Sequence, residues 1–155
     1  MQISHTYTVE AEPAAVLDAL LSTELNTARM EKFSISDYEF NTDGAQATLD
    51  ITVAADRLPK TVGKLLRSGA QATLTMRRED DVVHLEVSTK VPVKVELTLR
   101  VAPQVDGTTS AVQATGEVSV NMPLIGSKIE DAVSQRAARA LESDAALIAK
   151  VAASK

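Results

Sequence analysis

A long helix predicted from Ser127 to near the C-terminus is the feature that most limits the fold of this chain. Before it, about eighty residues alternate between apolar and polar side chains, a pattern typical of strands with one buried face. One long terminal helix after a series of antiparallel strands predicts a sheet that wraps around a helix. Such a fold often leaves a cavity between the sheet and the helix.

The predicted helix has a capping box at its start and one apolar face. Ser127 is the predicted N-cap and Glu130 the third helical residue, so each side chain would bond a free amide of the first turn. The apolar face consists of Ile129, Val133, Ala137, Ala140, Leu141, Ala145, Ile148 and Val151.

The rest of the chain predicts one strand, two short helices and then a series of strands. The first helix begins at Pro13, and the second covers 23–31. Alternation breaks phase within 33–40, and a bulge near Ser36 and Asp37 would restore it. Strands are predicted over residues 2–9, 33–40, 45–53, 71–76, 83–87, 91–101 and 112–120. Strands grouped apart from helices favour an α+β fold, with residues 1–155 forming a single domain.

Composition excludes several classes of protein. The chain has 155 residues, of which 45% are hydrophobic and 24% charged, which is ordinary for a globular domain with a real core. No apolar run approaches the roughly 18 residues of a membrane span, and no signal peptide is visible, so a cytoplasmic location is expected. Because the chain contains no cysteine, disulfides, thiol nucleophiles and cysteine-ligated metals are excluded.

Charge and aromatic content argue against nucleic-acid binding. The net charge is −5, whereas nucleic-acid affinity depends on neutralising phosphates. With two Phe, two Tyr and no Trp, a base-stacking platform is not expected. Two distant histidines give no metal-binding spacing, no catalytic motif is present, and no cofactor is predicted.

The order of elements resembles the helix-grip fold of the START and birch-pollen-allergen (SRPBCC) superfamily, which includes lipid-transfer domains and polyketide cyclases. The stretch from Val118 to Glu130 is similar to the strand-to-helix junction of an uncharacterised actinobacterial branch, a domain of unknown function. That junction reads close to Pro-Leu-Ile-Gly-Gly-Lys-Ile-Glu, and Ser127 replaces its second glycine. The resemblance implies a curved sheet of about six to seven strands and a cavity for hydrophobic ligands. It implies no catalytic residue.

Small residues on the predicted inner face either allow close packing or leave a cavity. Ala45, Ala47, Ala72, Ala114 and Gly116 are the small inward residues. A ligand cavity would hold roughly 300–1,000 Å³. The candidate cavity residues are His5, Tyr7, Leu49, Ile51, Leu74, Met76, Leu85, Val95, Leu97, Ala114, Val133 and Ala137.

His5 and Tyr7 share the inward face of the first strand. They are either polar groups that orient a ligand or an ordinary buried pair with hydrogen-bonded side chains. Together with Asp50, they could also supply a general acid or base.

The segment 56–69 predicts a basic amphipathic insert. At helical spacing Arg57, Lys60, Lys64 and Arg67 share one side, and Leu58, Val62, Leu65 and Leu66 share the other. The insert is either a lid that contacts an anionic group or a membrane surface, or a packed surface helix with solvated lysines. The lid or mouth candidates are Met30, Leu58, Lys60, Val62, Lys64 and Leu66.

These patterns favour a non-enzymatic protein that binds a hydrophobic or lipid-like small molecule. A protein-protein interaction module without a small ligand is one alternative, and a cyclase or hydrolase acting on a hydrophobic substrate is another. Peripheral membrane contact is compatible with the basic insert, and the oligomeric state stays open.

Overall fold

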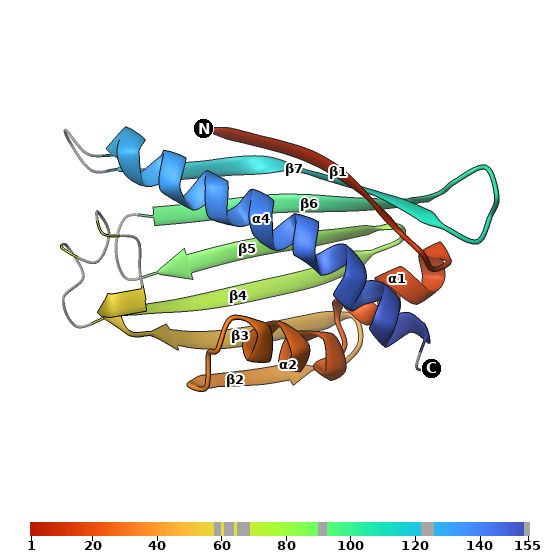
Figure 1. The fold of residues 1–155 in the computed structure, drawn as a ribbon, viewed down its shortest axis with the longest axis horizontal. Coiled ribbons are helices and arrows are strands. Elements are labelled where there is room, and N and C mark those ends of the chain that lie inside the picture. The colour runs from red at the N-terminus through yellow and green to blue at the C-terminus, as the bar shows by residue number, and fades with distance from the viewer. Residues whose placement is uncertain (58–59, 61–63, 65–68, 90–92, 122–125, 154–155) are drawn as a thin grey trace.

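A computed structural model describes residues 1–57, 60, 64, 69–89, 93–121 and 126–153 (Figure 1). The chain begins with one strand and two helices, continues with a series of strands, and ends with one long helix. These elements are β1 (Gln2–Val9), α1 (Pro13–Leu20), α2 (Thr23–Lys32), β2 (Tyr38–Thr42), β3 (Gln46–Val53), the short 3-10 helix η1 (Ala55–Arg57), β4 (Ala70–Glu79), β5 (Val82–Thr89), β6 (Val93–Pro103), β7 (Ser110–Val120) and α4 (Gly126–Ala153).

Seven antiparallel strands form one sheet in the order β1-β7-β6-β5-β4-β3-β2. The strands from β2 to β7 pair in sequence order, and β1 then pairs with β7 at the far side. The long helix α4 crosses one face of the sheet diagonally, and α1 and α2 lie on that same face (Figure 1). This arrangement confirms the predicted α+β helix-grip fold.

The predicted strand over 33–40 is correct only from Tyr38 onwards. Helix α2 continues to Lys32, and Phe33 caps its C-terminus by donating its amide to the carbonyl of Arg29. Ser34 then takes a left-handed backbone conformation with φ of 55°. The chain reverses here instead of forming a bulged strand, because the helix end requires a turn before β2 can begin.

The predicted N-cap is also displaced by at least one residue. Helix α4 includes Gly126, so Ser127 lies inside the first turn rather than before it. Glu130 bonds a different amide from the one predicted, because its Oε1 accepts from the backbone N–H of Val120 at 3.1 Å. This carboxylate therefore joins the start of α4 to the end of β7.

Two hydrophobic clusters lie between the helices and the sheet. The larger one packs α1 and the C-terminal half of α4 against the sheet, with Val16, Ile148 and Val112 each fully buried. The smaller one lies beneath the N-terminal half of α4 and consists of Ile3, Val95, Leu97 and Val118, with Val133 and Ala137 packed against it. Among the described residues, no helix is both long and apolar enough to cross a lipid bilayer.

Glycine is required where β6 and β7 approach each other beneath α4. A Cβ at Gly116 would lie 1.9 Å from the carbonyl oxygen of Glu96 and 2.8 Å from the Cα of Leu97. Gly116 is thus one of the predicted inward residues whose small size serves close backbone approach.

Candidate functional site

The inner face of the sheet is sealed at one end and partly open at the other. Met76 on β4 is 1% exposed and Val83 on β5 is fully buried, but Leu74 and Leu85, the next inward residues along those strands, are only half-buried. Strand β3 shows the same trend. The covering of the inner face therefore becomes less complete toward the end of β3 and the start of β4, which we call the open end.

Helix α4 is less completely covered in the middle of its N-terminal half. Ile148 and Val151 near its C-terminus are buried and so is Ile129 near its start, whereas Val133 and Ala137 between them are half-buried. In Figure 1 the N-terminal half lies over β6 and β7, so it leaves β3 and β4 to its side. The half-buried apolar residues on strands and helix thus belong to the same region of the inner face.

Hollows on the opposite face of the sheet have both polar and apolar walls. One of about 410 Å³ is lined by Asp50, Thr73 and Ser88 among others, and one of about 540 Å³ by Glu96, Thr98 and Thr115 among others. They lie outside the space between sheet and α4, so the cavity predicted in that space stays a prediction.

His5 and Tyr7 place two buried polar atoms on the inner side of β1. His5 Nε2 and Tyr7 Oη are inaccessible to solvent and form no hydrogen bond with the described residues. The two ring centroids are 6.2 Å apart, and Tyr7 is 8% exposed. Burying a polar group without a hydrogen-bond partner costs free energy. A ligand that formed hydrogen bonds with these two atoms would remove that cost.

The surroundings of Tyr7 keep its hydroxyl protonated. Burial raises the pKa of Tyr7 well above its ordinary value, and the negative charge of Asp144 acts in the same direction. The positive charge of Arg29 opposes this rise but has the smallest effect of the three. Near neutral pH the side chain is therefore a phenol whose O–H can donate.

A buried ion pair joins α2 to α4 near Tyr7. Arg29 donates to both carboxylate oxygens of Asp144, at 3.1 Å from Nε and 2.5 Å from Nη2. Its Nη1 donates to Asn26 Oδ1 at 3.2 Å, and Asn26 Nδ2 donates to the carbonyl of Ser22 at 2.8 Å. These bonds fix the position of α2 against α4.

Sequence reasoning missed this pair, although one signal for it was present. Asp144 lies between Leu141 and Ile148 on the apolar face of the helix, where an unpaired carboxylate would be costly. A charge in that position indicates a buried partner. Nothing in the local pattern identifies Arg29 as that partner, because 115 residues separate the two.

The predicted cavity residues fall into two groups. Some are buried, and others are half-buried; the half-buried ones lie toward the open end except His5, which is level with Val83 at the sealed end. The buried group is Tyr7, Leu49, Met76, Val95, Leu97 and Ala114, and the half-buried group is His5, Ile51, Leu74, Leu85, Val133 and Ala137.

The predicted lid residues are only partly described. Met30 is 4% exposed and lies within α2, while Lys60 and Lys64 are exposed. Leu58, Val62 and Leu66 lie outside the described residues, as does most of the predicted amphipathic helix. Within the described part of the chain, no three His, Asp or Glu side chains gather closely enough to hold a metal ion.

Solved structures with low sequence identity share this fold. The protein TTHA0849 from Thermus thermophilus is 13% identical, with a TM-score of 0.68 over 99% of this chain and 98% of that chain. Norcoclaurine synthase from Thalictrum flavum is 14% identical, with a TM-score of 0.66 over 97% of this chain and 85% of that chain. A START superfamily protein from Mycobacterium smegmatis is 15% identical, with a TM-score of 0.58 over 92% of this chain and 94% of that chain.

Sequence comparison gives the family without an activity. No curated protein sequence matches this chain significantly. Residues 4–151 match the family described as "Protein of unknown function (DUF2505)". The chain therefore belongs to the DUF2505 family of proteins of unknown function, and it has the fold of the START and birch-pollen-allergen superfamily.

Proposed function

We propose that this protein binds a hydrophobic or lipid-like small molecule between the sheet and α4, with access from the open end. The observation that supports this most strongly is the loss of burial along the inner face, from Met76 to Leu74 on β4 and from Val83 to Leu85 on β5. A ligand that covers these apolar side chains would be stabilised by about 25 cal/mol per Å² of apolar surface removed from water.

His5 and Tyr7 would orient the ligand. The Tyr7 hydroxyl is protonated and lies level with the sealed end, so it can donate to a carbonyl or hydroxyl oxygen at the deeper end of a ligand, away from the open end. The Nε2 atom of His5 can donate or accept, depending on which ring nitrogen carries the proton. A ligand that satisfies both atoms would remove the cost of burying them without partners.

A variant that fills the proposed site tests its position. Ala137→Leu adds apolar volume on the half-buried face of α4, so it should weaken ligand binding by about tenfold or more while leaving the fold intact. Ala146→Leu makes the same change at an exposed position of the same helix and should bind as the wild type does. Titration with a fluorescent fatty acid measures both affinities, and native mass spectrometry of gently purified protein detects a retained ligand.

Tyr7→Phe tests the orienting role. Because the hydroxyl has no partner among the described residues, its removal should leave the free energy of unfolding unchanged or slightly higher, while binding of a ligand with an oxygen acceptor weakens.

Failure to bind fatty acids or neutral apolar probes, together with no retained species, would contradict the proposal and favour a protein-protein interaction module. Conversion of a bound hydrophobic compound would instead favour the enzymatic alternative.

A further inference from the structure

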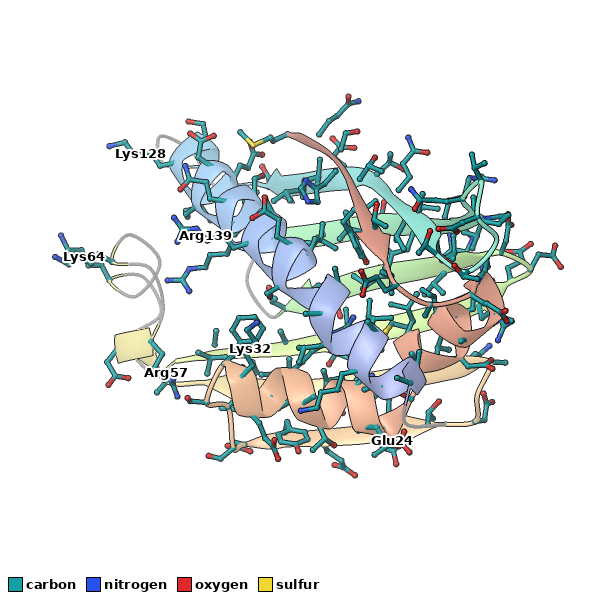
Figure 2. The ribbon with its side chains drawn as sticks, turned by 45° about the vertical axis from the view of Figure 1, so that its right-hand side comes forward. Glu24, Lys32, Arg57, Lys64, Lys128 and Arg139 are labelled. Carbon is teal, nitrogen blue, oxygen red and sulfur yellow. The ribbon has the colours of Figure 1, made fainter. Side chains whose placement is uncertain are left out.

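One side of α4 carries basic residues that face the open end. Glu130 and Ser134 lie on the side next to β1, because Glu130 approaches the N-terminal amine at 3.9 Å and Ser134 Oγ donates to Met1 Sδ at 2.9 Å. At about 100° per residue, Arg136 and Arg139 lie on the opposite side of the helix. Both are exposed, and Figure 2 shows Arg139 extending away from the sheet's β1 edge.

Two further elements bring basic side chains to the same end. Lys32 is the last residue of α2, and Arg57 ends η1. The guanidinium of Arg57 donates to the carbonyls of Ser34 and Phe33, which fixes the start of the insert beside the C-terminus of α2. Lys64 lies on the insert beyond Arg57, on the side of the molecule toward which Arg139 extends (Figure 2).

We define the basic rim by the exposed cations of the N-terminal half of α4, the end of α2 and the insert that begins at η1. The rim consists of Lys32, Arg57, Lys60, Lys64, Lys128, Arg136 and Arg139. These are seven of the sixteen lysines and arginines of the chain, and they outnumber the exposed acidic neighbours on the same stretches, Glu31, Asp56 and Asp131.

Four of the described basic residues outside the rim form ion pairs, Arg29, Arg77, Arg78 and Lys94, whereas Arg100 and Lys150 form none. Arg78 on the sheet lies 2.6 Å from Asp18, and Lys94 lies 2.9 Å from Glu96. Within the described part of the chain, Lys32, Lys64 and Arg139 form no ion pair. Their charges are therefore available to an anionic guest.

We propose that the ligand of this site is an anionic amphiphile, whose carboxylate or phosphate head is held by the basic rim while its apolar tail covers the half-buried inner face. The inference depends on the proposed function and assigns the chemical class of its ligand. The positions of the rim cations support this ligand class. Some of the cations lie on α4 and the others on α2 and the insert, on two sides of the half-buried apolar residues of the inner face. A single head group between them would meet positive charge from both sides.

A small ligand fits these observations better than a membrane surface does. A protein that inserts into a bilayer surface needs several large apolar side chains exposed beside its cations. Of the described large apolar residues, Met1, Phe33 and Val105 are the exposed ones, and Val105 lies in the turn between β6 and β7. Of these three exposed residues, Phe33 is the one next to the rim, because its backbone carbonyl accepts a hydrogen bond from Arg57.

The test compares head groups at constant tail length. Dodecanoate, dodecyl phosphate, dodecanol and dodecyltrimethylammonium are each titrated against the protein loaded with the neutral probe N-phenylnaphthylamine, whose displacement gives the affinity. Both anions should bind at least about tenfold more tightly than the alcohol and the cation. This preference should fall as salt is raised, since the Debye length shortens from about 10 Å at 0.1 M to about 3 Å at 1 M.

Charge reversal identifies the residues responsible. Arg139→Glu and Lys64→Glu should each weaken dodecanoate binding about three- to tenfold and leave dodecanol binding unchanged. Arg100→Glu changes the net charge by the same amount on the exposed outer face of β6 and should leave both affinities unchanged.

Three results would overturn the inference, and each differs from a failure of the proposed function. Equal affinity for dodecanoate and dodecanol means that the site binds the apolar tail and does not discriminate between a charged and a neutral head group. Weakening by Arg100→Glu as large as by Arg139→Glu means that only net charge matters. Loss of sedimentation with anionic phospholipid vesicles in Arg139→Glu, with dodecanoate binding intact, means that the rim binds a membrane. If no amphiphile displaces the probe or binds at all, the proposed function itself fails.

Discussion

At the scale of single residues, Arg29 and Asp144 are the charged residues that lie buried within the described part of the chain. Their side chains are 11% and 9% exposed, so either charge alone would be nearly desolvated. Two hydrogen bonds join them, and Asn26 accepts a third from Arg29. The pair therefore holds α2 against α4 beside the ligand-orienting candidate Tyr7.

Removing one partner should be far more costly than replacing both. Asp144→Ala leaves the Arg29 guanidinium buried without its counter-charge and should lower the free energy of unfolding by about 3–5 kcal/mol. The double variant Arg29→Met with Asp144→Leu should lose much less, because no charge remains buried. Urea denaturation measures both, and equal losses in the single and double variants would show that the two residues do not depend on each other.

Tyr7 should make stability fall at high pH. Because burial raises its pKa in the folded protein, the folded state holds the phenol proton more firmly than the unfolded state does. The contribution of this difference to the free energy of unfolding is fully present below the unfolded pKa of about 10. It is lost progressively as the pH rises above that value. Tyr7→Phe should show a smaller alkaline loss of unfolding free energy than the wild type or Tyr38→Phe, as measured by urea denaturation between about pH 8 and 11. Identical losses in all three proteins would exclude this role.

At the scale of elements, the two halves of α4 have different surroundings. Ile148 is fully buried in the larger cluster, whereas Val133 is half-buried beside the open end. The same helix thus seals one end of the inner face and borders the proposed site at the other.

Alanine substitutions in α4 should separate these two roles. Ile148→Ala should cost about 2–5 kcal/mol of unfolding free energy, because it leaves a cavity in a closed core. Val133→Ala should cost no more than about 1 kcal/mol, because solvent already reaches this side chain. Thermal and urea unfolding check the difference, and similar costs at both positions would mean that the inner face is sealed along its whole length.

Local signals also explain which elements were predicted correctly. Strict alternation in β1, β3 and β6 indicated their inward faces, and Pro13 marks the start of α1. The strand predicted over 33–40 was wrong at its start because Phe33 and Ile35 have strand-like spacing but follow the end of a helix. Helix termination and strand alternation give the same short apolar pattern, and local sequence cannot decide between them.

At the scale of the whole molecule, a ligand that binds only the folded protein must stabilise it. Dodecanoate at about one hundred times its dissociation constant should add about 2.7 kcal/mol to the free energy of unfolding. For a domain of this size, that corresponds to a rise of about 5–10 °C in Tm. Differential scanning calorimetry measures the shift, which should shrink in Ala137→Leu and persist in Ala146→Leu. No shift with dodecanoate or dodecanol would argue against a ligand site in the folded protein.

The amino-acid sequence by itself determined the order of the elements, the two faces of most strands, the apolar face of α4 and the basic character of the insert. All of these follow from repeats of two or 3.6 residues and from turn chemistry, which act over a few neighbouring residues. Only the tertiary structure decided that Arg29 meets Asp144, that burial decreases toward one end of the inner face, and that cations from three separate elements surround that end. These features depend on how α4 crosses the sheet, and that crossing is set by packing between segments far apart in the chain.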